Sequence, residues 1–435
     1  MGEQSLKNIT RPVRVYRVRL DGVKGQSIVT PVDASPLLPL PDKPSIAVLP
    51  FTNMSGDSEQ EYFADGMVEE IITALSRVRW LFVIARNSTF TYKGQAVDVK
   101  QVGRELGVRY VLEGSVRKAG QRVRITGQLI DALTGTHLWA DRFDSSLEDV
   151  FELQDKVAAG VAGVIEPTLQ IAEIRRSSER PTADLTAYDL YLRALAHTFS
   201  HEKDQLAQAL ELLGRAIDRD HSYSPALGLA ALCHQLLHIN GWTDDQEATR
   251  RKGVDLARRA VRVGTDEPNA LCRAAFVLGF FGEDIDFAIG LTDRCLALNP
   301  SFADGWYFSG LLRIYVGLPD LAIEHFETSI RLSPRNPTRN HSLGGTGAAH
   351  FFSGRFPEAA AKLLACVEEF PLFATSYRLL AACYAHMGRL DDARQIVQRL
   401  RSVTPVVMES ALRYRNTEHR ELFLSGLRLA VGEDT

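Results

Sequence analysis

Cysteine is scarce in this chain of 435 residues and follows no pattern. All of the cysteines lie in the second half of the sequence, and no two of them form a CxxC pair. An odd and scattered set argues against a disulfide framework and for reduced thiols in a cytoplasmic protein. Because free cysteine is among the most buried residue types, we expect small core residues at all five positions. These are Cys233, Cys272, Cys295, Cys366 and Cys383.

Neither sign of charge dominates, and long apolar runs are missing. The 50 basic and 54 acidic residues give a net charge of -4, which excludes a chain-wide cationic field that would recruit nucleic acid or an anionic membrane. No uninterrupted apolar run approaches the ~20 residues that a membrane-spanning helix needs. The N-terminus also lacks the apolar stretch of a signal peptide. We therefore expect no nucleic-acid partner and no membrane insertion.

Familiar catalytic motifs are absent as well. The sequence has no GxSxG elbow, no GxGxxG turn and no P-loop GK[ST]. His234 and His238 are four residues apart in HQLLH, but a zinc peptidase needs Glu after the first His, and this chain has Gln235. We interpret both histidines as ordinary helix residues. The sequence thus predicts no catalytic residue, no metal site and no cofactor.

Residues 45–145 have the pattern of an α/β unit. SIAVLPF, from Ser45 to Phe51, is a short apolar run typical of a strand buried on both faces. Helical spacing over 62–75, a second strand over 81–85 and a second short helix over 97–106 follow. Three period-two segments joined by turns then predict an antiparallel meander. We expect a mixed sheet covered by helices, with an amphipathic helix over 147–165 after it.

Composition changes mark the boundaries of the chain's parts. Over residues 11–20, apolar and polar side chains alternate, which is the pattern of a strand. Residues 31–44 contain five prolines and form a semi-stiff linker. A polar stretch, SSERPTADL, follows the amphipathic helix. The predicted division is 1–30, the linker 31–44, the α/β unit 45–145, a helix and linker 146–186, and an all-α region 187–435.

The second half of the chain repeats itself. Four alanines, at steps of 34, 37 and 34 residues, are each followed twelve residues later by proline, and mostly small residues precede each alanine by twelve. A small residue allows two antiparallel helices to approach closely, and the proline ends the second helix. The positions that carry this signature are Ala288, Pro300, Trp306, Gly310, Ala322, Phe326, Pro334, Gly347, Ala359, Pro371, Ala393 and Pro405.

This period resembles the tetratricopeptide repeat, a helix-turn-helix unit. The best copy begins at Ala303, and about six copies fill the all-α region. The resemblance implies a solenoid whose concave groove, lined by the first helix of each repeat, holds an extended peptide or a protein domain. The exposed groove positions expected by this likeness are Arg273, Phe280, Tyr307, Tyr315, His341, Arg378 and His386. The alternative is that each of these side chains solvates its helix or packs on the next repeat.

A second candidate site lies in the α/β unit. Polar residues gather near predicted strand ends, where open α/β sheets bind ligands. They are Asp57, Asp65, Gly66, Arg86, Asn87 and Ser88. Turn and cap roles are the alternative for these residue types.

Three phrases of the α/β unit resemble the TolB-like domain of bacterial multidomain signalling proteins. They begin SIAVLPFTNMSGDSEQEYF, ARNSTFTYKG and GVRYVLEGSVRKAGQRVRI. The opening GEQSLKNITRPVRVYRV is similar to the closing strand of a class III nucleotide cyclase domain. Rhizobial-type adenylate cyclases join such a domain to a TolB-like domain and tetratricopeptide repeats in this order. Residues 1–30 would then be a remnant of the cyclase domain.

The resemblance leaves two hypotheses. The metal-binding aspartates of a class III cyclase precede its closing strand, so we expect no cyclase activity and favour a non-catalytic interaction and regulatory module. The alternative is an adenylate cyclase whose catalytic domain comes from another chain or a longer reading frame. In either case residues 1–30 should be disordered or pair with a neighbouring chain. The partner, the signal and homo-oligomerisation stay open.

Overall fold

The computed structural model describes residues 3–4, 13–14, 43–55, 61–119, 122–146, 150–179, 185–333, 339–408 and 413–432. The chain divides into two units, Met1–Leu37 and Leu38–Thr435. In the first unit, β1 (Glu3–Gln4) pairs antiparallel with β2 (Val13–Arg14). Most of the strand predicted over 11–20 and most of the linker predicted over 31–44 lie outside the described residues. The predicted domain boundaries stay predictions.

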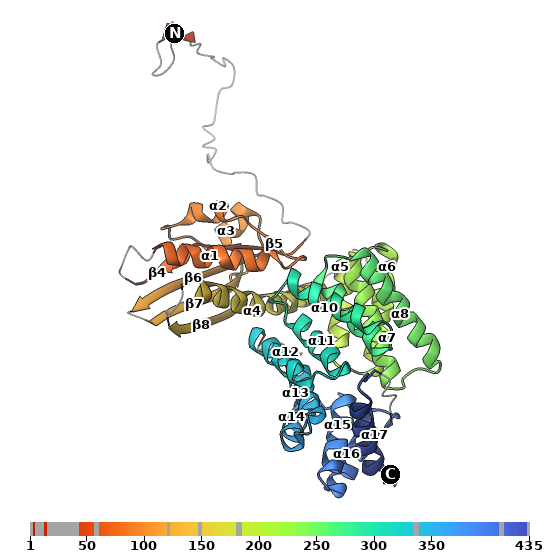
Figure 1. The fold of residues 1–435 in the computed structure, drawn as a ribbon. Coiled ribbons are helices and arrows are strands. Elements are labelled where there is room, and N and C mark those ends of the chain that lie inside the picture. The colour runs from red at the N-terminus through yellow and green to blue at the C-terminus, as the bar shows by residue number, and fades with distance from the viewer. Residues whose placement is uncertain are drawn as a thin grey trace. The chain divides into compact units, whose positions relative to one another are not determined.

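The second unit begins with a mixed sheet (Figure 1). Its strands run in the order β5-β3-β6-β7-β8, and β4 pairs with β6. Strand β3 is parallel to both β5 and β6, whereas β6, β7 and β8 form the antiparallel meander. The mixed sheet that the sequence predicts is confirmed. The strands are β3 (Ser45–Val48), β4 (Thr52–Asn53), β5 (Phe82–Val83), β6 (Tyr110–Ala119), β7 (Arg122–Asp131) and β8 (His137–Ser146).

Helices cover both faces of this sheet, which explains the apolar run of β3. Ile46 and Val48 pack toward α1 (Glu61–Ser76) and α4 (Val150–Glu179), while Ala47 packs with α3 (Val99–Leu106) on the other face. Alternating side chains of a strand point to opposite faces. Ile46, Ala47 and Val48 are therefore all apolar, because each side chain enters a buried layer. Two short elements, α2 (Arg86–Thr89) and the 3-10 helix η2 (Phe90–Tyr92), complete the unit.

Helix α4 is longer than the sequence predicts, because it continues past Pro167. Its first half lays Leu153, Val157 and Val161 on the sheet. Among the described residues one stretch, Glu152–Glu179, is apolar and long enough to cross a bilayer by those two criteria, and half of its most apolar window is buried. Packing against the sheet accounts for this apolar character, as in the core helix of a globular domain.

The second half of α4 is fixed by a buried carboxylate. Glu173 is fully buried and accepts hydrogen bonds from Arg109 Nη1 at 2.8 Å and Tyr110 Oη at 2.6 Å. Arg176, one turn further along the same helix, donates to the other carboxylate oxygen at 2.7 Å. Two arginines and a tyrosine thus compensate the buried charge. The network joins the end of α4 to the start of β6.

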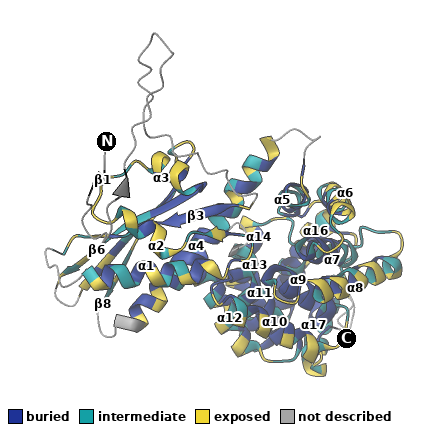
Figure 2. Cartoon of the chain, turned by 90° about the horizontal axis from the view of Figure 1, so that it is seen from above, coloured by how far each residue is buried: buried dark blue, intermediate teal, exposed yellow. Residues whose placement is uncertain are grey.

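The remaining described helices form six antiparallel pairs and a last single helix, α17 (Thr417–Val431). The first helices of the pairs lie side by side and are largely buried, as α7, α9 and α11 show in dark blue, while α6, α8 and α12 carry exposed faces (Figure 2). The pairs are α5 (Ala187–Thr198) with α6 (Lys203–Arg219), α7 (Ser224–Ile239) with α8 (Gln246–Val263), α9 (Pro268–Phe280) with α10 (Ile285–Leu298), α11 (Ala303–Tyr315) with α12 (Pro319–Leu332), α13 (Arg339–Phe352) with α14 (Phe356–Glu369), and α15 (Ala374–His386) with α16 (Leu390–Val403).

The repeat signature falls at the contacts between paired helices. Ala288, Ala322, Ala359 and Ala393 are all fully buried. A Cβ placed at Gly310 would lie 2.6 Å from the Phe326 ring, and one at Gly347 would lie 2.7 Å from Leu363 Cγ. The indole Nε1 of Trp306 donates to the carbonyl of Pro300 at 2.8 Å. Pro300, Pro371 and Pro405 each stand two residues after a second helix ends, and Pro334 lies outside the described residues.

Candidate interaction site

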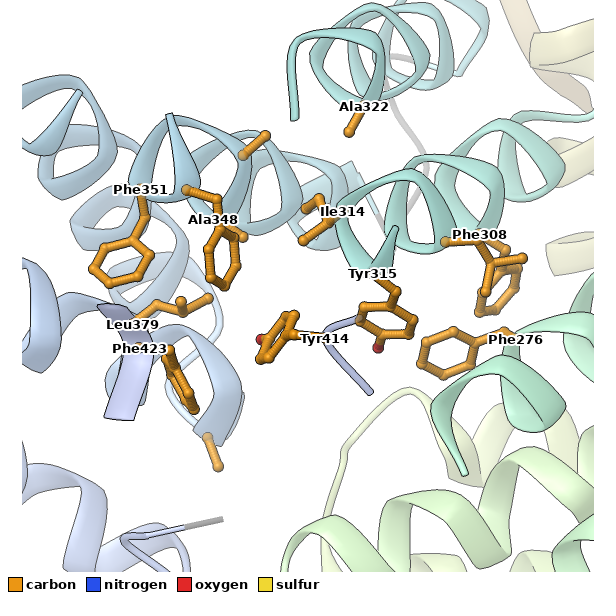
Figure 3. Packing of buried hydrophobic residues seen from close by; sticks show 14 of the residues in the cluster. Phe276, Phe308, Ile314, Tyr315, Ala322, Ala348, Phe351, Leu379, Tyr414 and Phe423 are labelled. Atoms are coloured by element: carbon orange, nitrogen blue, oxygen red, sulfur yellow. The ribbon is translucent and has the colours of Figure 1, made fainter. Parts of the chain in front are cut away.

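The first helices of the repeats line a partly open cavity. Its volume is about 240 Å³, and its walls come from α5, α7, α9, α11, α13 and α15, from the loops beside them, from Gln170 of α4 and from the segment before α17. Aromatic and aliphatic side chains predominate. In Figure 3, the rings of Phe276, Tyr315 and Tyr414 lie next to one another, and all three residues line the cavity.

Five of the seven predicted groove residues line this cavity. They are Arg273, Phe280, Tyr307, Tyr315 and His341. The expectation that the seven positions are exposed is wrong. Arg273 has 4% of its surface exposed, Tyr315 has 5% and Arg378 has none, and the other four side chains are partly buried. The repeat pattern identifies which side chains face inward. The pattern does not predict that a segment outside the repeats covers these side chains.

Arg378 and His386 lie outside the cavity wall and contact later parts of the chain. The guanidinium of Arg378 donates to the carbonyl of Val406 at 2.7 Å and to that of Ile239 at 3.1 Å. The ring of His386 stacks on Phe356, and its Nε2 lies 2.7 Å from the carbonyl oxygen of Leu422 in α17. Arg378 is therefore a structural tie between the last repeat and α7. Its replacement would disturb folding as well as any binding.

A segment after the last repeat covers the inner helices, and we call residues 404–408 and 413–416 the covering segment. Thr404 Oγ1 donates to the carbonyl of Asn240 at 2.8 Å. The backbone N–H of Arg415 donates to the carbonyl of Tyr315 at 2.7 Å. The ring of Tyr414 lies 5.7 Å from that of Tyr315 and 4.7 Å from that of Phe352. The concave face is thus occupied by the chain itself.

Two buried histidines meet at one end of the cavity. The rings of His201 and His341 are 5.1 Å apart, and both pack against Phe370 and Phe373. Burial lowers the pKa of His201 to about 4. Burial, with a contribution from His201, lowers the pKa of His341 to about 3. Both rings are therefore neutral near pH 7 and contribute aromatic surface without charge.

An arginine lies among aromatic rings at the covering segment. The Arg413 guanidinium carbon is 4.6 Å from the ring centroid of Tyr414 and 5.2 Å from that of Phe280. Only 3% of Arg413 is exposed. Cation–π attraction at such distances compensates part of the cost of burying the charge. The repeat pattern does not identify Arg413, because this residue follows the last helix pair.

The polar residues predicted near the strand ends do not form one site. Asp65 accepts from Lys93 at 2.6 Å, whereas Arg86 pairs with Glu69 at 3.6 Å and lies over the Phe90 ring. Asp57 lies outside the described residues. A separate hollow of about 1100 Å³ opens beside β4, β6 and β7, and none of the predicted residues that the structure describes lines it. This candidate site is not supported by the geometry.

Metal and thiol chemistry have no candidate in the described part of the chain. No group of three His, Cys, Asp or Glu side chains is close enough there to hold a metal ion. All five cysteines are free and buried, as predicted. Burial raises the pKa of Cys233 to about 12 and that of Cys383 to about 12, so these thiols stay protonated.

Two family models match parts of the chain. The model for the second domain of HilA/YgeH-like transcriptional regulators matches residues 42–159, which is the α/β unit. A tetratricopeptide-repeat model matches residues 346–404. The second match confirms the repeat type that the sequence predicts.

The chain is also similar in part to two solved structures. TolB from Acinetobacter baumannii has a TM-score of 0.22 and 17% identity, covering 31% of this chain and 30% of that chain. A tetratricopeptide repeat protein from Parabacteroides merdae has a TM-score of 0.33 and 16% identity, covering 56% of this chain and 89% of that chain.

One curated relative is much closer in sequence. It is 41% identical over 280 residues and is named Putative adenylate cyclase 3, from Rhizobium meliloti (strain 1021). The match covers 64% of this chain and 47% of the relative, so the chain spans about half the length of the curated relative it matches. This match confirms the predicted resemblance to adenylate cyclases. Over 64% of its length the chain is thus similar to a protein named as an adenylate cyclase, and its repeats are of the tetratricopeptide type.

Proposed function

We propose that the chain is a non-catalytic interaction and regulatory module of adenylate cyclase-type signalling. In this proposal the helical repeats hold a peptide or protein partner and transmit its presence to a cyclase. The observation that supports it most is the repeat array itself, because stacked helix pairs present a long inner surface suited to polypeptide. The relative named as an adenylate cyclase supplies the signalling context.

The covering segment suggests how a partner would bind. Backbone groups of this segment make the contacts. The carbonyl of Val406 accepts from the Arg378 guanidinium, and the N–H of Arg415 donates to the carbonyl of Tyr315. Its Tyr414 ring packs between Tyr315 and Phe352. A partner peptide with an aromatic residue would use the same contacts after displacing this segment. The five free cysteines agree with a cytoplasmic location, which we include in the proposal.

Binding to a cyclase can be tested directly. The purified chain would be titrated by calorimetry into the portion of the Rhizobium meliloti relative that lies outside the matched region. We expect saturable binding, and tighter binding by the Tyr414→Ala variant, because loss of the Tyr414 ring weakens the covering segment. Leu318→Ala, which alters an exposed residue with 49% of its surface accessible, is the control. Absence of binding by both the chain and the Tyr414→Ala variant would contradict the proposal.

A second function is favoured by the relative's name alone. The chain would then be part of an adenylate cyclase that forms cyclic AMP only when a catalytic domain is supplied by another chain or a longer reading frame. Restored cyclic AMP formation on mixing the chain with an otherwise inactive catalytic domain supports this alternative. Regulation of an already active domain supports the first proposal.

A further inference from the structure

The cavity between the first helices has the size of a small-molecule site. At about 240 Å³ it exceeds the ~150 Å³ of an apolar cavity that holds benzene and approaches the roughly 300 Å³ at which ligand pockets begin. Phe276, Phe308 and Tyr307 supply aromatic surface to its wall. An occupant of this volume is a molecule of one or two rings, and a folded peptide does not fit.

Arg273 gives this apolar cavity a positive charge that is not held in an ion pair with any described residue. The residue is 4% exposed and lines the cavity from α9. Among the described residues, Arg273 makes no ion pair, and its one hydrogen bond goes from Nη1 to the hydroxyl of Tyr191 at 3.0 Å. The comparably buried Arg313 on the next repeat pairs instead with Asp293 at 2.7 Å. A buried guanidinium without a carboxylate is costly, and an anion in the cavity would remove that cost.

The charges around Arg273 favour an anion over a cation. Arg413 also lines the cavity, and Asp304 is the one carboxylate among the lining residues that the structure describes. The two histidines of the wall, His201 and His341, are neutral near pH 7 because burial lowers the pKa of each. The surroundings of Arg273 have a low dielectric constant, so the attraction of its guanidinium for an anion is strong.

Buried amide groups in the same wall require hydrogen-bond donors. Gln235 is 2% exposed, and its Oε1 is buried without a partner in the described part of the chain. Asn240 is 5% exposed, and its Oδ1 is also buried without a partner there. Leaving a buried acceptor unsatisfied costs stability, so a hydroxyl or amino group on the occupant would be recognised at this point.

We propose that this cavity binds a small aromatic carboxylic acid that also carries a hydroxyl or amino group. The Arg273 guanidinium pairs with the carboxylate, the Phe276 and Phe308 rings enclose the aromatic body, and the amide oxygen of Gln235 accepts from the donor group. This site goes beyond the proposed binding of a polypeptide partner, because it takes a molecule too small to be one.

Calorimetric titration of the full chain tests the site with three probes that differ in one group each. We expect saturable binding of 4-hydroxyphenylacetate, at least about tenfold weaker binding of its neutral amide, and weaker binding of phenylacetate, which lacks the hydroxyl. No saturable binding of any probe would overturn the proposal. Equal binding of the acid and the amide would overturn it too, and this comparison needs no variant.

Three variants assign the roles of the residues. Arg273→Met should weaken binding of 4-hydroxyphenylacetate by at least about tenfold, and Arg273→Lys should retain most of it, because the charge stays. Gln235→Leu should remove the preference for the hydroxyl. Arg313→Met, at a buried arginine outside the cavity wall, is the matched control and should bind like the parent chain. Undiminished binding by a folded Arg273→Met variant would overturn the assignment.

Discussion

The stability of this protein should depend on pH through individual buried ionisable residues, and Glu166 is one of them. Glu166 on α4 is 7% exposed and accepts a hydrogen bond from Asn299 Nδ2 at 3.4 Å. Burial, reinforced by the negative charge of Asp304, raises the pKa of Glu166 from 4.5 to about 8. Near pH 7 the folded chain therefore holds a proton that the unfolded chain has released.

The sign of the Glu166 effect follows from this difference in bound protons. Because the folded state binds the extra proton between about pH 4.5 and about pH 8, stability falls as pH rises through that range. Glu166→Gln, which mimics the protonated form, should reduce this fall in melting temperature and raise stability near pH 8. Glu211→Gln, at an exposed position of α6, is the control. An unchanged pH profile in Glu166→Gln would show that Glu166 is ionised in the folded chain.

Residue-scale prediction from sequence succeeds where a repeat fixes the environment. The repeated alanines are buried because each occupies the same helix contact in its own repeat. It fails at Arg378 and Tyr315, because the groups that bury them come from the covering segment and α7, far along the chain. The sequence indicates Gln235 only weakly as a cavity residue, because it is a polar residue within the apolar run of α7.

Contacts between paired helices depend on the small residues of the repeat. Phe326 is fully buried, and a Cβ at either Gly310 or Gly345 would lie 2.6 Å from its ring. The ring therefore has no room to move away from either side. Gly310→Ala should destabilise the chain, since overpacking costs about 1–3 kcal/mol and exceeds the gain in helix propensity. Urea denaturation measures the change.

A second glycine supplies the control for that prediction. Gly214 lies inside α6, and a Cβ there would meet nothing within 4 Å. Gly214→Ala should stabilise the chain by about 0.5–1 kcal/mol through helix propensity alone. If both variants were stabilised equally, close helix packing would not explain the small residue at position 310.

The junction between α4 and the sheet depends on Glu173. Its removal would leave Arg109, which is 4% exposed, without its carboxylate partner. Glu173→Ala should therefore cost about 3–5 kcal/mol in the free energy of unfolding. Asp144→Ala breaks the exposed pair with Arg124, where both side chains are about half exposed, and should cost far less, because water screens exposed charges. Similar losses in the two variants would contradict the structural role of the buried network.

Element-scale prediction follows the periodicity of the sequence. The alternating pattern over 107–145 predicts the meander, and the 34-residue period predicts the paired helices, because each pattern determines its own buried face. The second half of α4 was missed, because the prediction ended at Ile165 and the helix runs on past Pro167 to Glu179. Tertiary contacts of Glu173 hold the helix on the far side of that proline.

At the scale of the Leu38–Thr435 unit, the repeat array is closed by its own chain. Thr404, Val406 and Arg415 join the covering segment to α7, α15 and the end of α11. The groove that the sequence predicts to be open is covered in part by this segment, and the first helices line a small cavity. Any polypeptide partner must compete with these contacts, so its apparent affinity should reflect how often the covering segment is displaced.

Cyclic AMP formation from ATP is the measurement that tests the proposed function most directly. The chain would be assayed with Mg²⁺ or Mn²⁺, alone and mixed with an active cyclase domain from the Rhizobium meliloti relative. The account predicts no cyclic AMP from the chain alone and a saturable change in the rate of the added domain as the chain concentration rises. Robust turnover by the purified chain alone, or an added domain whose rate the chain leaves unchanged, would contradict it.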